Sequence, residues 1–233
     1  MRLHFKEIDS TSTFLKNNVC EFDHGDLVSA DYQNAGHGQV GNSWESEQYM
    51  NALFSLLMKP EKIPACAGFR ITEIVTLGIL DALPDFDLRI KWPNDIYAGD
   101  RKLCGVLIET SIQAGHIDRA IIGIGLNVNQ TRFVSDAPNP VSLAQLADCR
   151  FDVKEVMERV VAAILERYES VVDCHGEYLS HLYRRAEWHE FERPNGERFE
   201  GMIIDVEDNG LLVMRMRSGE IAHFEFKSLK YVL

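Results

Sequence analysis

The sequence predicts an α+β protein, in which a domain with a mixed, largely antiparallel sheet and helices is followed by a small all-β module. Strand-like runs and two segments with helical spacing alternate through the first 186 residues. After Trp188, short strand-like runs are separated by turn sequences. A chain of 233 residues with 45% hydrophobic content can bury a sizeable core. We therefore expect a larger domain over residues 1–186 and a β module over residues 187–233.

The composition argues against several classes of protein. A formal net charge of −12 is unlike that of duplex-binding proteins, which normally carry a basic face. The first residues lack the apolar core of a signal peptide, and no apolar run approaches transmembrane length. The five cysteines are odd in number and show no C-x-x-C spacing. We expect a cytoplasmic protein that binds neither nucleic acid nor membrane, with no disulfide framework and no structural zinc.

The N-terminal segment predicts a strand, a helix and a second strand. Residues 3–8 and residues 27–32 are the strand candidates. Between them, the short oxygen side chains of Ser10 and Thr11 can accept the free amide hydrogens at the start of a helix. The same hydroxyl groups could instead face a ligand, although capping is the more common role.

Residues 33–44 form a loop in which three glycines alternate with polar residues, directly after a strand. Bare backbone of this kind can approach a ligand closely. The spacing matches neither a P-loop nor G-x-G-x-x-G, because no G-K-[ST] follows and the third glycine comes too early. An ordinary surface loop is the simpler interpretation. Trp44, at the end of the loop, is either a core residue or a stacking surface.

Residues 89–110 are the most informative stretch of the chain. Pro93 has no amide hydrogen and favours extended geometry at Trp92, so a strand should break there. Gly99 introduces a turn before residues 102–108 continue as a mostly apolar strand. Five polar or charged side chains lie within this hairpin, namely Lys91, Asn94, Asp95, Arg101 and Lys102. Polar and charged side chains within a mostly apolar hairpin predict either a solvated face or the wall of a binding site.

The remaining elements follow from periodicity and turn residues. In chain order we expect a strand over residues 51–58, a helix over residues 67–83, a strand over residues 117–125, a helical turn over residues 141–146 and a helix from about residue 152. Gly123 and Gly125 inside a strand indicate a bulge or room for a ligand, and Asn127 follows them directly. Strands of the β module are expected over residues 199–206, 211–216 and 221–226, with turns at 208–210 and 217–219.

The hairpin sequence resembles the signature of biotin protein ligases. K-W-P-N-D at residues 91–95, followed by R-K-L-C-G-V-L at residues 101–107, is similar to K-W-P-N-D … R-K-L-x-G-[IV]-L. Ser10-Thr11, the glycine loop, residues 121–127 and the C-terminal β module match in the same order. The resemblance covers nearly the whole chain. It implies a class II synthetase-like biotin/lipoate ligase catalytic domain with helices on one side of the sheet, plus an SH3-like β-barrel.

The resemblance also implies a two-step reaction. Biotin and ATP, with Mg²⁺ carried by the nucleotide, would form biotinyl-5′-AMP. A lysine of a biotin carboxyl carrier domain in a biotin-dependent carboxylase would then attack the mixed anhydride. The chain resembles the short, monofunctional form of the family without a DNA-binding domain, and a monomer or homodimer is expected.

Site residues are implied position by position. Lys102 matches the lysine placed where the carboxylate meets the α-phosphate, and Asp95 matches an acidic position near the incoming carrier lysine. The expected biotin-binding residues are Ser10, Thr11, Gln33, Gly36, His37, Gly38, Lys102, Gly105 and Gly123. The expected nucleotide-binding residues are Gln39, Trp44, Lys91, Asn94 and Asn127.

The glycine loop departs from the family pattern. The family loop commonly reads G-R-G-R-x-G, whereas residues 36–41 read G-H-G-Q-V-G. Loss of one charged contact to phosphate costs on the order of 1.5–3 kcal/mol. We expect backbone amides of residues 36–41 to close over the ligand.

Two alternatives to a biotin ligase stay open. The first is a lipoate-type ligase, which the W-P-N-D sequence argues against. The second is a catalytically weak biotin-binding or regulatory homologue, which the arginine-free loop suggests.

Overall fold

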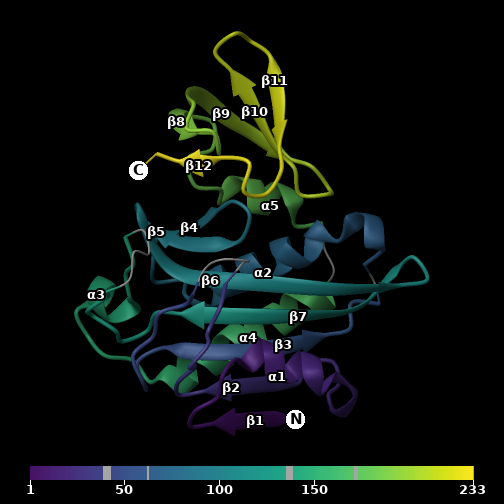
Figure 1. The fold of residues 1–233 in the computed structure, drawn as a ribbon, viewed down its shortest axis with the longest axis vertical. Coiled ribbons are helices and arrows are strands. Elements are labelled where there is room, and N and C mark those ends of the chain that lie inside the picture. Colours follow the sequence, from purple (N-terminus) through teal and green to yellow (C-terminus); the bar gives the residue numbers. More distant parts are fainter. Residues whose placement is uncertain (39–42, 62, 135–138, 171–172, 233) are drawn as a thin grey trace.

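The computed structural model describes residues 1–38, 43–61, 63–134, 139–170 and 173–232, which build two separate β-sheets and five α-helices (Figure 1). In sheet order, the larger sheet contains β1 (Arg2–Phe5), β2 (Leu27–Ala30), β3 (Ala52–Met58), β7 (His116–Leu126), β6 (Arg101–Gln113), β5 (Asp95–Ala98) and β4 (Leu88–Lys91). The helices are α1 (Thr11–Asn17), α2 (Phe69–Ala82), α3 (Leu143–Ala147), α4 (Val153–Ser170) and α5 (His175–Ser180).

The larger sheet is mixed and largely antiparallel, as predicted. Its β1 and β2 strands pair in parallel, and every other neighbouring pair is antiparallel. The predicted hairpin comprises three strands, because β4 and β5 are separated by a turn that contains the cis peptide bond between Trp92 and Pro93. The long β6–β7 hairpin runs through the centre of the sheet and carries the three glycines that matter for the site.

Helices cover both faces of this sheet, so the expectation of helices on one side was wrong. The two long helices, α2 and α4, pack with one face of the sheet in the main core. On the other face, Leu15 of α1 packs with Val28, Leu57 and Ile121 in a separate apolar cluster. The side chains alternate between the two faces along each strand, because successive residues of a strand point in opposite directions.

The α2 helix was predicted over nearly its observed length, and α4 begins where expected. The amide of Glu155 donates to Oδ1 of Asp152 over 2.9 Å at the start of α4. The predicted apolar stripe of Val156, Val160, Ile164 and Tyr168 is buried; the last predicted member, Val171, lies outside the described residues. The short α5 helix was not predicted. Among the described residues, no helix has the length and apolar character needed to cross a membrane.

The second sheet is antiparallel and has five strands. In sheet order they are β11 (Ile221–Phe224), β10 (Leu212–Met216), β9 (Arg198–Val206), β8 (Trp188–Glu192) and β12 (Lys230–Tyr231). The predicted turns are present, and Gly210 and Gly219 adopt φ of +89°, which a side chain would disfavour. Strands β8 and β12 were not predicted. The domain boundary between residues 186 and 187 stays a prediction.

The second sheet lies above β4, β5 and α5 in Figure 1, and buried groups connect it to the larger sheet. The indole Nε1 of Trp92 donates to the carbonyl oxygen of Gly210 over 3.0 Å, and the Trp92 ring lies 5.2 Å from the ring of Phe226. His175 of α5 bridges the two parts, because Nδ1 lies 2.7 Å from Oε1 of Glu73 and Nε2 lies 3.2 Å from Oδ1 of Asp205. Glu73 is buried on α2, and Asp205 belongs to β9.

A close approach of α2 and α4 at Gly78 gives the first prediction. A Cβ atom on Gly78 would lie 2.8 Å from Cα of Ile164. We therefore expect Gly78→Ala to lower the free energy of unfolding by roughly 1–3 kcal/mol, although alanine ordinarily stabilises a helix by about 0.5–1 kcal/mol relative to glycine. Gly176→Ala in α5 is the control, because its Cβ would meet nothing within 4 Å. Urea unfolding of both variants checks the prediction; equal stabilities would contradict it.

The second prediction concerns His175 and pH. Burial lowers the pKa of His175, but the hydrogen bonds to Glu73 and Asp205 outweigh burial and raise it above the ordinary value. A raised folded pKa means that the stabilisation is fully present below about pH 6.5 and fades as pH rises through the folded pKa. His175→Gln should therefore lower Tm most at acid pH, by an amount that corresponds to about 1 kcal/mol. Thermal unfolding from pH 5 to 9 measures this, with His116→Gln at an exposed position of β7 as the control. A loss of Tm that did not vary with pH would contradict it.

Candidate functional site

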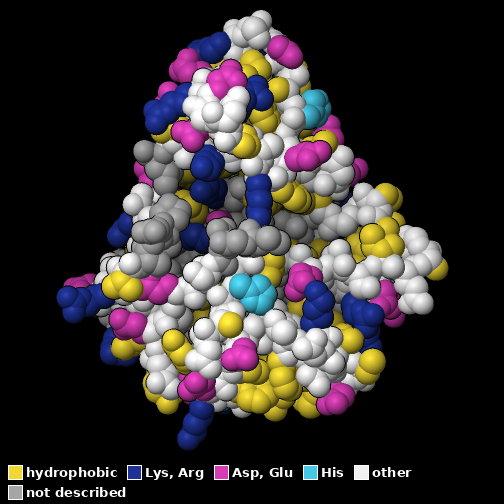
Figure 2. Space-filling view, viewed as in Figure 1, with side chains coloured by type: hydrophobic (Ala, Val, Ile, Leu, Met, Phe, Trp, Pro, Cys, Tyr) yellow, Lys and Arg dark blue, Asp and Glu magenta, His cyan; other side chains and the backbone are white. Residues whose placement is uncertain are grey.

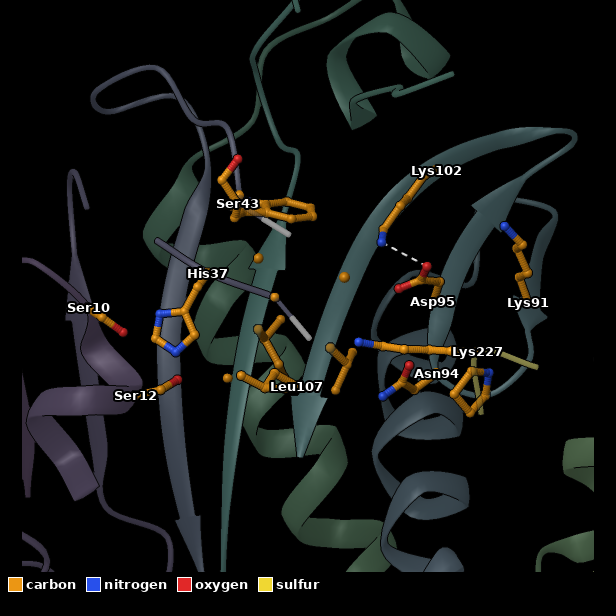
Figure 3. Close-up of a pocket in the computed structure, with 18 of the residues that line it drawn as sticks. Ser10, Ser12, His37, Ser43, Lys91, Asn94, Asp95, Lys102, Leu107 and Lys227 are labelled. Atoms are coloured by element: carbon orange, nitrogen blue, oxygen red, sulfur yellow. Dashed lines mark ion pairs between the residues drawn. The ribbon is translucent and has the colours of Figure 1, made fainter. Parts of the chain in front are cut away.

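A cavity of about 640 Å³ opens between the α1 face of the larger sheet and the C-terminal sheet. Its size falls in the range of about 300–1,000 Å³ that is typical of small-molecule sites. Neutral polar groups line one side, and charged groups line the other (Figure 3). The sequence-predicted residues that line it are Ser10, Thr11, Gln33, His37, Gly38, Trp44, Lys91, Asn94, Asp95, Lys102, Gly105 and Gly123.

The neutral side is a connected hydrogen-bond network at the start of α1. Gln33 Oε1 accepts from the amide of Thr11 over 2.8 Å and lies 3.1 Å from Thr11 Oγ1. Ser55 Oγ, on β3, lies 2.8 Å from the hydroxyl groups of both Thr11 and Ser12. Because Oε1 of Gln33 is engaged, the amide nitrogen is the end of this side chain that can serve a ligand.

Ser10 has the capping role, and its predicted role toward a ligand stays a prediction. Its Oγ accepts from the amide of Thr13 over 3.3 Å and caps α1, and the residue also lines the cavity. Ser10 and Thr11 are nearly buried, with 5% and 2% of their surface exposed. Buried polar groups must be hydrogen-bonded. The polar edge of a ligand that enters here must therefore offer donors and acceptors that pair with these hydroxyl groups.

The floor of the cavity is made of glycine backbone. Gly105 of β6 and Gly125 of β7 are directly paired, and the indole of Trp44 lies against both. A Cβ on Gly105 would lie 2.7 Å from Cζ3 of Trp44, and a Cβ on Gly123 would lie 2.5 Å from Oγ of Ser12. Side chains at these positions would therefore collide with Trp44 and Ser12. The Trp44 indole Nε1 is buried and has no hydrogen-bond partner among the described residues.

The charged side centres on an ion pair between neighbouring strands. Lys102 Nζ of β6 lies 2.7 Å from Oδ2 of Asp95 at the start of β5. The turn at Gly99 brings the two strands together, and both side chains keep about a quarter of their surface exposed, 23% and 27%. Lys102 Nζ also lies 5.8 Å from the centre of the Trp44 ring. The pair thus faces both solvent and the glycine floor.

Lys91 is enclosed by aromatic rings from both sheets. Its Nζ donates to the hydroxyl of Tyr97 over 3.0 Å and lies 5.0 Å from the ring centre of Tyr231 on β12. Burial lowers the pKa of Lys91; nearby Asp95 opposes this effect, and Lys102 adds to it. A cation in so enclosed a position gains from any anion that enters the cavity.

The turn between β4 and β5 is held from two sides. Tyr178 of α5 is fully buried and donates its hydroxyl hydrogen to the carbonyl oxygen of Pro93 over 2.8 Å. Trp92 is held by the C-terminal sheet, as described above. Asn94, only 8% exposed, is presented to the cavity between these two anchors.

The C-terminal sheet supplies part of the wall, which the sequence did not predict. The residues are Lys227, Leu229, Lys230 and Tyr231. One signal was available: the last two lysines of the chain, Lys227 and Lys230, lie close together here. Ser12, Ser43, Ser55 and Leu107 are further residues at or behind the wall that were not assigned a binding role.

Two of the predicted residues that the structure describes, Asn127 and Gly36, are not brought to this cavity. Asn127 is 2% exposed and donates from Nδ2 to the carbonyl oxygen of Val141 over 3.1 Å, and it does not line the cavity. Gly36 lines a neighbouring hollow at the base of the glycine loop, where its carbonyl oxygen accepts from the amide of Trp44 over 2.9 Å. Gln39 lies outside the described residues, as do residues 40 and 41 of the segment that was expected to close over a ligand.

No group of three or more His, Cys, Asp or Glu side chains gathers into a metal-binding cluster within the described residues. The oxygen donors near the ion pair are the side chains of Asn94 and Asp95. Mg²⁺ is commonly held by one or two protein oxygens together with substrate phosphates. This donor set fits a metal that arrives with a nucleotide.

Residues 4–127 match the model of the Biotin/lipoate A/B protein ligase family. The bifunctional ligase/repressor BirA of Escherichia coli is 37% identical over 134 residues, which cover 57% of this chain and 42% of that protein. BirA of Bacillus subtilis is 27% identical over 222 residues, covering 87% of this chain and 64% of that protein. The chain thus spans less than two thirds of the length of these relatives.

A solved structure shares the fold over nearly the full chain. It is the biotin protein ligase from Aquifex aeolicus in complex with biotin and ATP, with a TM-score of 0.81, 25% sequence identity and 99% of each chain covered. The biotin–[acetyl-CoA-carboxylase] ligase of Mycobacterium tuberculosis is 26% identical over 200 residues, covering 82% of this chain and 73% of that protein.

The glycine floor gives the third prediction. A Cβ on Gly125 would lie 2.4 Å from Cε2 of Trp44, so Gly125→Ala should displace the indole from the sheet. Displacement exposes the ring to water, and the intrinsic fluorescence should shift to longer wavelength. The same substitution in a Trp44→Phe background is the control and should produce no shift. A shift that persisted without Trp44 would show that the change lies elsewhere.

Proposed function

Because the chain belongs to the biotin/lipoate A/B protein ligase family, we propose that it is an ATP-dependent ligase for biotin. It activates biotin as biotinyl-5′-AMP and transfers the biotinyl group to a lysine of a biotin carboxyl carrier domain. Support comes from the names of its relatives and from the likeness to a ligase structure that contains biotin and ATP. The carrier belongs to a biotin-dependent carboxylase, and cytoplasmic location and oligomeric state stay predictions.

The single observation that carries the proposal is the position of the Lys102–Asp95 pair across the cavity from the neutral network. In the first step, the biotin carboxylate attacks the α-phosphate, so two anions must meet. The ammonium group of Lys102 reduces their repulsion and stabilises the charge that builds as the bond forms. Asp95 directs this ammonium group at the cavity through the 2.7 Å contact.

In the second step, the amine of the carrier lysine attacks the carbonyl carbon of the adenylate, the bond from that carbon to the phosphate oxygen breaks, and AMP leaves. An amine is nucleophilic only when deprotonated, and a carboxylate at hydrogen-bond distance can accept or orient its proton. Asp95 is the one carboxylate among the described residues that line the cavity. We assign this role to it.

The neutral side suits the ureido ring of biotin. A ureido group presents one carbonyl acceptor and two N–H donors, and the network of Ser10, Thr11 and Gln33 offers matching donors and acceptors. Gly105 and Gly123 are assigned to the ring and its tail because they line the cavity and have no side chains that would narrow it. A lipoyl group would fit this end less well, because its dithiolane ring cannot pair with the buried polar groups. This observation favours biotin over lipoate.

The nucleotide would occupy the rest of the cavity. Trp44 supplies an aromatic surface for the adenine, and Lys91 supplies positive charge. Asn94 is the amide that can hold the phosphates or their Mg²⁺, which supplies further charge neutralisation when bound. The roles predicted for Asn127 and Gln39 remain predictions. A homologue that binds biotin without turnover is the alternative suggested by the arginine-free loop.

The fourth prediction tests the function. The protein is incubated with ATP, either biotin or lipoate, and a carboxylase carrier domain, and carrier modification is measured by mass spectrometry. We expect biotin transfer, with Lys102→Ala slowing biotin-dependent ATP–pyrophosphate exchange by about 10²–10³-fold. The fold should persist, because Lys102 is partly exposed.

Lys16→Ala is the matched control. Lys16 forms an ion pair of the same length, 2.7 Å, with Glu109, and neither residue lines this cavity. Its loss should leave exchange unchanged. Transfer of lipoate in place of biotin would refute the choice of substrate, and binding of biotin without adenylate formation would support the non-catalytic alternative. Full exchange in Lys102→Ala would refute the assignment of the site.

A further inference from the structure

The turn that follows β11 places a lysine in the cavity from the C-terminal sheet. The amide of Ser228 donates to the carbonyl oxygen of Glu225 over 3.0 Å, which closes a tight turn around Phe226 and Lys227. Figure 3 shows the side chain of Lys227 extending toward the middle of the cavity, between Asn94 and Asp95. The side chain reaches a site whose other charged groups belong to the larger sheet, with the exception of Lys230.

The backbone at this turn is unusual for a lysine. Lys227 has φ of +67°, in the left-handed region that favours glycine or asparagine. The turn is held in place on both sides, because the Phe226 ring lies 5.2 Å from the ring of Trp92 and Leu229 is buried. Strained backbone that the surrounding structure fixes is concentrated at functional sites. The position therefore favours a role for the side chain over a role in the turn itself.

Lys227 stands where two cavities meet. A second cavity of about 950 Å³ adjoins the first, and the two share six wall residues: His37, Gly38, Pro93, Asn94, Leu107 and Lys227. A ligand that extends from the first cavity into the second passes this junction. The triphosphate of a nucleotide bound near Lys102 is such a ligand.

The charge distribution favours an anion at the junction. Four lysines and one carboxylate line the first cavity, in a chain with a net charge of −12. Figure 2 shows Lys and Arg side chains gathered at mid-height, where the C-terminal sheet meets the rest of the molecule. A protonated carrier lysine would be repelled at such a place, whereas phosphate would be attracted.

We propose that Lys227 binds the β- and γ-phosphates of ATP and stabilises the pyrophosphate as it leaves; this rests on the proposed function. An oxygen of the biotin carboxylate forms a bond to the α-phosphorus, and the bond from that phosphorus to the bridging oxygen breaks. The electron pair stays on the bridging oxygen, so negative charge grows on pyrophosphate, next to the ammonium group. Residues 33–44 contain no lysine or arginine that could do this.

The fifth prediction uses Lys227→Gly, which removes the cation and suits the left-handed backbone. Its Tm should equal or exceed that of the unmodified protein. Calorimetric titration with inorganic pyrophosphate, and separately with ATP, should show binding weakened about tenfold or more. Biotin titrated alone should bind with unchanged Kd. Lys227→Arg should retain most of the affinity for pyrophosphate, because it keeps the charge.

Arg215→Ala is the matched control. Arg215 is an exposed residue of β10, so its loss removes one positive charge from the same sheet without touching the cavity. Equal weakening of pyrophosphate binding in both variants would show that the effect comes from the change in net charge and not from the position of Lys227. This result would overturn the proposal. Unchanged pyrophosphate and ATP binding in Lys227→Gly would also overturn it, as would a defect confined to the KM for the carrier domain. Because the titrations need no turnover, they decide the role of Lys227 even where biotin-dependent exchange is absent.

Discussion

The hydrogen bond from the Trp92 indole to the carbonyl oxygen of Gly210 joins the two sheets at the edge of the cavity. Trp92 is 5% exposed, so the loss of this bond would leave a buried donor unpaired, at a cost of about 1–3 kcal/mol. The same turn carries Asn94 and Asp95 into the cavity. One contact therefore positions residues of the larger sheet and docks the sheet that supplies Lys227 and Tyr231. The cavity depends on both parts being held together.

The electrostatics of the site differ from those of the whole protein. The chain is acidic, with a net charge of −12, yet its principal cavity holds four lysines and one carboxylate. Lys91 shows the physical consequence, because burial lowers its pKa and favours an anion nearby. Positive charge that is concentrated in a partly desolvated cavity acts more strongly than the same charge on an open surface. An acidic protein can in this way hold a nucleotide and a carboxylate.

Local sequence predicted most of the larger sheet and both long helices, because hydrophobic periodicity and capping residues act within a few positions. Ser10 and Asp152 cap α1 and α4, and the breaks at Pro93 and Gly99 separate β4, β5 and β6. The placement of helices was predicted incorrectly, since nothing in the short α1 sequence tells which face of the sheet it covers. Strands β8 and β12 were missed; β12 has only two residues and forms by pairing with β8, which lies far from it in the chain.

The sequence by itself determined the chemistry of the β4–β6 segment: Lys91, Asn94, Asp95 and Lys102 lie within twelve residues, and tight turns force them to one side. Only the tertiary structure decided which distant groups complete the cavity. Gln33 meets Thr11 and Ser55 through sheet pairing, and Lys227 arrives from another sheet, more than 120 residues beyond Lys102. Asn127 donates to the carbonyl oxygen of Val141, and its role toward the nucleotide stays a prediction. Such outcomes depend on packing between segments that are far apart in the chain, which no local pattern encodes.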